Sequence, residues 1–439
     1  MTYDRHGVLG MAKALNELGA LEAVKRLQRR ELSAVQMARA CLARIEQREP
    51  AVRAWTALDP AQVIAQAQAL DAASLRGVLH GLPLGVKDIF DTHDLPTCYG
   101  SGIYSTHQPD SDAAVVALCR EAGALVLGKT VTTEFATYQP GPTRNPCNTS
   151  YTPGGSSSGS AAAVADAMVP LAIGSQTAGS VIRPAAYCGV VGYKPTFGRV
   201  SRAGMKLLSE SLDTVGGFAR SVEDMALLVS VLMGDKRLRE LPEVSLPRIG
   251  MLRTFQWRHA QAETREAYED AARRLSRAGA VVEDIELPVQ DCSLVQLHAD
   301  VMAFEAAQGL AFERTRCRQQ LGTRLLALLD AGAAIRAEDH QERLTRAALA
   351  RARALQWFDQ YDVLLVPSTT GEAPFLEQGT GDPLFCRVWT LLGFPAVHLP
   401  FSSGPQGLPV GLQVLGPPHA DYKLLSTARW MHPVLQGEC

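Results

Sequence analysis

The chain has 439 residues, 46% hydrophobic and 20% charged, so it can bury a large core without disulfides. A formal net charge of -2 offers no basic field to a phosphate backbone, and we expect no nucleic-acid partner. No signal-like start or apolar stretch of about 18 residues occurs, so we expect no membrane partner. Nine scattered cysteines without zinc-like spacing indicate a cytoplasmic protein with reduced thiols and no metal site.

The N-terminal part predicts helices. Apolar residues recur at helical spacing over residues 33–47, with Ser33 placed as the cap and Pro50 as the stop. Residues 51–75 are rich in Ala, Gln and Asp and predict further helix. At Arg76 the composition changes to glycines, prolines and short apolar runs, which are typical of strands and tight loops.

The middle of the chain is dominated by small residues. A capped helix is predicted over 111–122 and a strand over 124–127. Residues 140–217 then have the highest density of Gly, Ser, Thr and Pro, interrupted by an Ala-rich segment at 160–167 and an apolar run at 169–173. Glycine-rich loops bring backbone amides close to a ligand, so we expect the chemistry here.

Charged helices return after Ser221. Arg- and Ala-rich tracts at 264–277 and 342–358 predict helices, and apolar runs at 363–366 and 396–399 predict strands. Alternating helices and apolar strands indicate an α/β fold with a largely buried sheet. Because no repeat, linker or low-complexity tail is present, residues 1–439 are predicted to form one domain.

Two motif matches fail on their context. The segment GALVLGKT at 123–130 fits the phosphate-binding loop pattern, but its variable positions are apolar and form the predicted strand itself. The segment GSSSG at 155–159 fits a nucleophile elbow centred on Ser157, which must follow a strand. The preceding residues 145–153 contain two prolines and no apolar run. A hydrolase using Ser157 and a histidine therefore remains a weaker alternative.

Three glycine-flanked polar residues remain: Lys87, Ser156 and Ser180. A serine needs a base to become a nucleophile, and none of these segments contains a histidine. Lys87 lies among apolar residues, and burial can lower the pKa of a lysine until it is neutral. Each residue alone would more often be structural, but together they predict a serine nucleophile with a lysine base.

These segments resemble the signature of the amidase signature family. The resemblance is carried by PGGSSSGSAAAVA and GSQTAGSVIRPAAYCGVVGYKPT, and also by GLPLGVKDI, GALVLGKTVTTEFA, SLDTVGGFARSVEDMALL, YDVLLVPST and GLPVGLQVLGPP. It covers nearly the whole chain. It implies a single large mixed β-sheet covered by helices on both faces, one amidase domain with its catalytic core at about 76–220, and no cofactor.

The resemblance also implies roles for single residues. Lys87 takes the place of the catalytic lysine, Ser156 that of a bridging serine after a cis peptide bond from Gly155, and Ser180 that of the nucleophile. The amides of residues 177–180 would form the oxyanion hole. Such an enzyme cleaves a carboxamide, or a related urea, carbamate or ester, through an acyl-enzyme.

The loop before the nucleophile departs from the family pattern. Gln176 stands where many relatives have Asp, and Ala178 where many have Gly, while Thr177 and Gly179 fit the proposed oxyanion hole. Arg183 suggests a clamp for a substrate carboxylate, as in malonamide-hydrolysing relatives. A structural ion pair behind the loop is the favoured alternative for Arg183.

Three functions are compatible with this pattern. The first is a free-standing amidase with a small-molecule amide substrate. The alternative is the A-type component of a glutamyl-tRNA amidotransferase, which would pass ammonia from glutamine to a partner; Gln176 and Ala178 speak against it. A catalytically dead binding protein conflicts with an intact triad. Cys188 is predicted to be a core residue and His93 a turn or surface residue, and a homo-oligomer stays open.

Overall fold

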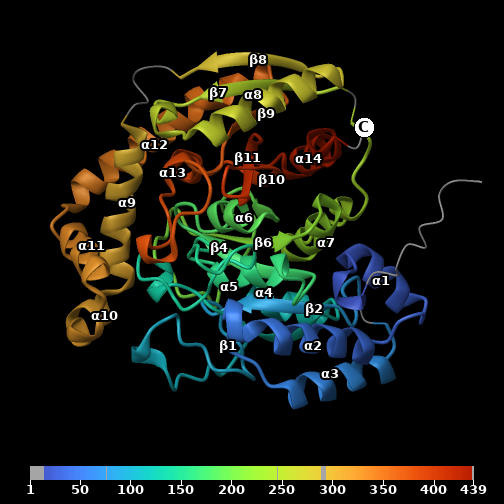
Figure 1. Cartoon of the computed structure of the whole chain (residues 1–439). Helices are drawn as coiled ribbons and strands as arrows, with labels where there is room; N and C mark the ends of the chain where they lie inside the picture. The colour runs from blue at the N-terminus through green and yellow to red at the C-terminus, as the bar shows by residue number, and fades with distance from the viewer. Residues whose placement is uncertain (1–13, 76, 245, 288–292, 438–439) are drawn as a thin grey trace, which may run out of the picture.

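The computed structural model describes residues 14–75, 77–244, 246–287 and 293–437. Its centre is a mixed sheet of eleven strands in the order β1-β3-β2-β4-β6-β5-β10-β11-β9-β7-β8 (Figure 1). The strands are β1 (Trp55–Ala57), β2 (Pro83–Lys87), β3 (Leu125–Thr130), β4 (Leu171–Gln176), β5 (Val191–Lys194), β6 (Thr214–Ala219), β7 (Arg248–Arg253), β8 (Val281–Glu286), β9 (Val363–Pro367), β10 (Ala396–Ser403) and β11 (Pro409–Leu415).

Helices surround this sheet. In Figure 1, α1 to α3 lie near the β1 end, α8 near the β8 end, and α9 to α12 gather at one side of the molecule. The helices are α1 (Ala20–Gln28), α2 (Ala34–Val52), α3 (Pro60–Ala72), α4 (Ala114–Glu121), α5 (Ser158–Ala165), α6 (Ile182–Cys188), α7 (Val222–Leu232), α8 (Ala262–Arg277), α9 (Leu294–Gly309), α10 (Ala311–Arg316), α11 (Thr323–Ala333), α12 (Ala337–Leu355), α13 (Leu384–Leu391) and α14 (Asp421–Gln436).

Two adjacent glycines of β6 show that both faces of the sheet are covered. A Cβ at Gly216 would lie 3.2 Å from Val181, which precedes α6, whereas one at Gly217 would lie 2.7 Å from Leu228 of α7. Successive strand residues point to opposite faces, so α6 and α7 lie on opposite sides. The predicted α/β fold, with helices on both faces of one large mixed sheet, is confirmed.

The strand order brings the signature segments together. β2 is parallel to both of its neighbours, β3 and β4. Parallel strands end at the same edge of a sheet, so Lys87 at the end of β2 lies near the loop that follows β4. The glycine-rich chain before α5 packs over the same edge, where Thr133 N donates to Ser156 O over 3.2 Å.

The prediction for the first helix is right at its start and wrong at its end. Ser33 accepts from Gln36 N and forms a capping box, as expected. Pro50 does not stop α2, which continues to Val52, where Arg53 adopts a left-handed conformation. A proline lacks one amide and clashes with the preceding turn, a disturbance that this final turn accommodates.

The prediction of continuous helix over residues 51–75 is partly wrong. Strand β1 interrupts it at Trp55–Ala57, and α3 begins only at Pro60. The carboxylate of Glu49 accepts from the amides of Ala54 and Trp55, each over 2.9 Å, and so ties down the connection. The other predicted helices and strands correspond to α4, α5, α8, α12, β3, β4, β9 and β10 within a few residues.

Candidate functional site

Lys87 is a fully buried lysine whose amine faces hydroxyl groups. Its Nζ lies 2.7 Å from Ser156 Oγ, 2.8 Å from Ser175 Oγ and 3.4 Å from Ser175 O. No carboxylate of a described residue forms an ion pair with it. Burial lowers the pKa of Lys87 to about 7, although the charge of Asp213 acts in the opposite direction. The amine can therefore be neutral near pH 7 and accept a proton from Ser156.

Ser156 follows a cis peptide bond, as the resemblance implies. The carbonyl of Gly155 accepts from Arg183 Nη2 over 2.7 Å and from Arg183 Nε over 3.2 Å. This guanidinium therefore holds the peptide group next to the bridging serine. Ser156 itself is 1% exposed, so its hydroxyl is kept from bulk water.

Ser180 lies in the loop between β4 and α6 and is 6% exposed. Its carbonyl accepts from Ser157 N over 3.4 Å, which joins the two serine-bearing segments. Its hydroxyl forms no hydrogen bond with another residue in the described part of the chain. That hydroxyl borders a small cavity and is available to an incoming carbonyl carbon.

The amides beside Ser180 are also available. Those of Ala178, Gly179 and Ser180 donate to no acceptor within the described ranges. A loop that exposes consecutive amides next to a nucleophile can stabilise an oxyanion. Ala178 does not adopt a left-handed conformation, so an alanine in place of glycine causes no backbone strain here.

Gln176 organises the loop from below. Its Oε1 accepts from the amides of Val181 and Ile182 over 2.9 and 3.0 Å, and its Nε2 donates to Thr390 Oγ1 over 3.0 Å. A carboxylate would accept the same two amides. The departure from Asp to Gln therefore keeps the cap of α6 and gives no reason to exclude an amidotransferase component.

Polar groups behind the loop hold Thr177 in place. Its hydroxyl donates to Asp213, and its carbonyl lies 2.9 Å from His298 Nε2. Burial raises the pKa of Asp213. Burial, with the neighbouring charge of Arg387, lowers the pKa of His298 to about 3, so the imidazole stays neutral. The nucleophile loop is thus held without a second base.

Arg183 is occupied rather than free. Besides the two bonds to Gly155, its Nη1 donates to the carbonyl of Gly381. All three nitrogens are thereby engaged with backbone carbonyls, so these contacts favour the structural role over the carboxylate clamp. The structural partner is a pair of carbonyl groups, and not the ion pair that the sequence suggested.

Two cavities lead to Ser180. The inner one, of about 60 Å³, is lined by Thr177, Ala178, Ser180 and Arg183 together with Tyr138, Leu208, Met302 and Arg387. The outer one, of about 790 Å³, is open and lined by Tyr138, Tyr151, Tyr187 and Arg387 among others. Ring stacking of Tyr151 on Phe375, at 4.7 Å between centroids, forms part of the outer wall. A substrate would pass through the outer cavity to the nucleophile.

The rejected motifs are structural. Residues 125–130 of the phosphate-loop match form the buried strand β3, so no loop can surround a phosphate. Ser157 does not follow a strand, and its hydroxyl lies 3.2 Å from Ser175 O. Cys188 is buried in α6, with Sγ 3.4 Å from Pro153 O.

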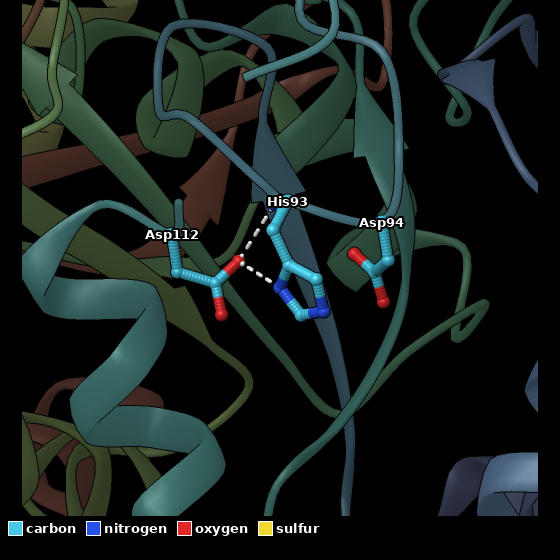
Figure 2. A group of neighbouring side chains, drawn as sticks. All are labelled: His93, Asp94 and Asp112. Carbon is cyan, nitrogen blue, oxygen red and sulfur yellow. Dashed lines mark hydrogen bonds and ion pairs between the residues drawn. The ribbon is translucent and has the colours of Figure 1, made fainter. Parts of the chain in front are cut away.

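His93 forms a surface cluster away from Lys87. Figure 2 shows its ring between Asp112 and Asp94, with His93 Nδ1 3.0 Å from Asp112 Oδ1. Arg120 pairs with both carboxylates, at 2.6 Å from Asp94 and 3.1 Å from Asp112. This guanidinium already neutralises the acidic groups that a cation would need, and the cluster is best described as an ion-pair network.

Several residues of the site carried no sequence signal. Ser175, Asp213, His298 and Arg387 lie outside the residues selected from the sequence. Ser175 could have been found, because it lies in GSQTAGS at the end of a predicted strand. His298 and Arg387 come from helices without a recognisable motif, and only the fold brings them to the nucleophile loop.

Comparison with known proteins agrees with this geometry. The family model described as Amidase matches residues 36–425. The chain belongs to the amidase family. The A-type component of the glutamyl-tRNA(Gln) amidotransferase of Symbiobacterium thermophilum is 34% identical, covering 91% of this chain and 93% of that protein.

Solved amidase structures share the fold of the whole chain. A crystal structure of an amidase superposes with a TM-score of 0.88 at 31% identity, covering 94% of this chain and 99% of the other. The peptide amidase from Stenotrophomonas maltophilia gives a TM-score of 0.82 at 30% identity, covering 94% and 96%. This amidase family member therefore has the architecture of enzymes acting on carbon–nitrogen bonds.

The expectation of no nucleic-acid partner is contradicted. Curated relatives at 33–34% identity over nine-tenths of the chain are named as the A-type component of glutamyl-tRNA(Gln) amidotransferase, which refers to a tRNA substrate and further subunits. Net charge was a poor guide because one component of a complex can act on tRNA-bound groups without carrying the phosphate-binding surface itself. In the described ranges, no helix has both the length and the apolar character that a bilayer crossing requires.

Proposed function

We propose that this chain hydrolyses a primary carboxamide through an acyl-enzyme on Ser180, with Ser156 as the proton bridge and Lys87 as the base. The observation that carries the proposal is a fully buried amine placed 2.7 Å from Ser156 Oγ with no carboxylate to keep it charged. An unpaired buried lysine is costly to a fold, and it is expected where its neutral form is used.

The reaction follows from these positions. Neutral Lys87 takes the proton of Ser156, which takes the proton of Ser180 as Ser180 Oγ bonds to the amide carbon. The amides of residues 178–180 stabilise the oxyanion. The proton then returns through Ser156 to the nitrogen, the carbon–nitrogen bond breaks, and ammonia leaves. Water, deprotonated by the same relay, hydrolyses the ester on Ser180 and releases the acid.

A test is ammonia release from a panel of amides that includes glutamine, a simple aliphatic amide and dicarboxylic monoamides. Ser180→Ala should abolish release, whereas Ser157→Ala, a matched serine outside the relay, should lose less than about tenfold. Hydroxylamine should trap the acyl group as a hydroxamate only when Ser180 is present. Full activity of Ser180→Ala would disprove the proposal.

A second candidate use of the same chemistry is the glutaminase step of a glutamyl-tRNA(Gln) amidotransferase. The names of the curated relatives favour it, and the role of Gln176 removes one objection to it. The solved amidase structures favour a free-standing enzyme. A marked preference for glutamine, with ammonia channelled to a co-purifying protein, would support the amidotransferase; rapid hydrolysis of other amides by the isolated chain would support the free-standing amidase.

A further inference from the structure

Arg387 is an arginine on the wall of the inner cavity whose guanidinium is almost unused. It lies on α13 and lines both cavities, as do Tyr138, Gly381 and Pro383. Its one side-chain hydrogen bond to another described residue is from Nη1 to His298 Nδ1, over 3.4 Å. Within the described residues, no carboxylate oxygen comes within 4.0 Å of it. A guanidinium has five N–H donors, so most of them remain available.

Arg183 on the same cavity wall provides the contrast. Its three nitrogens donate to the carbonyls of Gly155 and Gly381, and its side chain is 5% exposed. Arg183 therefore has little capacity for a ligand. Arg387 is only half-buried and keeps its donors for the cavity. Two guanidinium groups around one small cavity without a carboxylate create a positive site, which a neutral carboxamide does not require.

His298 fixes Arg387 relative to the nucleophile. The imidazole lies between Arg387 and the carbonyl of Thr177, with Nε2 2.9 Å from that oxygen. Thr177 begins the loop that carries Ser180. An anion bound by Arg387 would therefore be held at a set place with respect to the attacking hydroxyl, which is the positioning that catalysis needs.

We infer that Arg387 binds a carboxylate on the acyl part of the substrate, so that the preferred substrate is a short amide with an anionic end. This inference rests on the proposed function. Ammonia is the leaving group of a primary carboxamide, so the anion must belong to the acyl group. The inner cavity of about 60 Å³ admits only a short chain between the carboxylate and the amide carbon.

The test compares paired substrates. The monoamides of malonic, succinic and glutaric acid are each measured beside an analogue in which a methyl ketone replaces the carboxylate. With the best pair, Arg387→Met should lower kcat/KM for the monoamide by roughly 30- to 100-fold, mainly through KM, and for the ketone by less than about threefold. Arg387→Lys should recover part of the loss. Arg336→Met, at an exposed arginine that pairs with Asp339, is the matched control.

Equal losses on both members of the pair, or no preference of the wild type for the monoamide, would overturn the inference while leaving the proposed function intact. A binding measurement separates the two claims if the wild type hydrolyses no amide at all. Calorimetry with glutarate should then show binding to the wild type and to Arg336→Met, and weaker binding by at least about tenfold to Arg387→Met. Equal binding to all three, or no binding, would overturn the role of Arg387.

Discussion

Lys87 and Lys129 lie on adjacent parallel strands, both fully buried, but in different company. Lys129 on β3 has the carboxylate of Asp88 at 3.0 Å and Thr97 Oγ1 at 2.6 Å. Lys87 on β2 has only serine oxygens. Burial lowers the pKa of both amines, and Asp88 opposes this effect at Lys129. One lysine is thus kept as a structural ion, and the other is left able to exchange a proton.

The difference teaches that burial alone does not make a base. Lys194 is also buried, with its pKa lowered to about 7, yet its Nζ donates to the carbonyl of Pro195 and no serine hydroxyl of the described chain is bonded to it. A lysine becomes useful here only where burial, a missing carboxylate and a hydroxyl relay coincide. Lys87 meets all three conditions.

The largest expected effect comes from removing the proton acceptor. Lys87→Met should reduce kcat by about 10⁴-fold or more, because the serines lose their base. Its free energy of unfolding should not fall, since a buried amine without a carboxylate is replaced by an apolar side chain. Steady-state kinetics and urea unfolding measure both quantities. A destabilised variant with near-normal kcat would reverse the comparison.

Lys129→Met should show the opposite pattern. Removing one partner leaves Asp88 buried and unpaired, which costs about 3–5 kcal/mol of unfolding free energy. The double variant Lys129→Met/Asp88→Leu should recover most of that loss. Chemical denaturation of the three proteins checks this prediction. Unchanged stability of the single variant would mean that the ion pair has no structural weight.

The pH dependence of kcat/KM should follow the neutral fraction of Lys87. With its pKa near 7, the rate should fall about tenfold for each unit below pH 7 and level off above pH 8. The direction is fixed because the relay needs the unprotonated amine. A rate that stays constant down to pH 5 would show that another group is the base.

The smallest effect is expected at His93. Its imidazole is 53% exposed and pairs with Asp112, and not with Lys87. His93→Ala should leave kcat within about twofold and lower the unfolding free energy by less than about 1 kcal/mol. A large loss of activity would connect this surface cluster to the relay after all.

Most of the fold and the three residues of the relay could be predicted from sequence, because motifs of small residues mark both the sheet edge and the loops around it. Lys87, Ser156 and Ser180 lie on segments 24 to 93 residues apart, and β2 and β4 bring them to one edge. The helix over 33–47 was recognisable from its cap, but not its extension through Pro50, which depends on how the last turn packs.

The substrate-facing wall could not be predicted. His298 lies on α9 and Arg387 on α13, in helices with no motif, and only tertiary packing joins them to Thr177. The occupied state of Arg183 was equally hidden, because sequence proximity to Ser180 says nothing of which carbonyls a guanidinium reaches. Chemistry that resides in contiguous loops is readable from sequence, whereas specificity assembled from distant helices is not.

The most direct test is titration of the lysine side chains by heteronuclear NMR of the Ser180→Ala protein, observing Cε and Nζ. The Lys87 signal, assigned by its loss in Lys87→Met, should titrate with a pKa near 7, well below that of an ordinary exposed lysine. A Lys87 amine that remains protonated at pH 9 would contradict the claim that the relay runs on a neutral lysine.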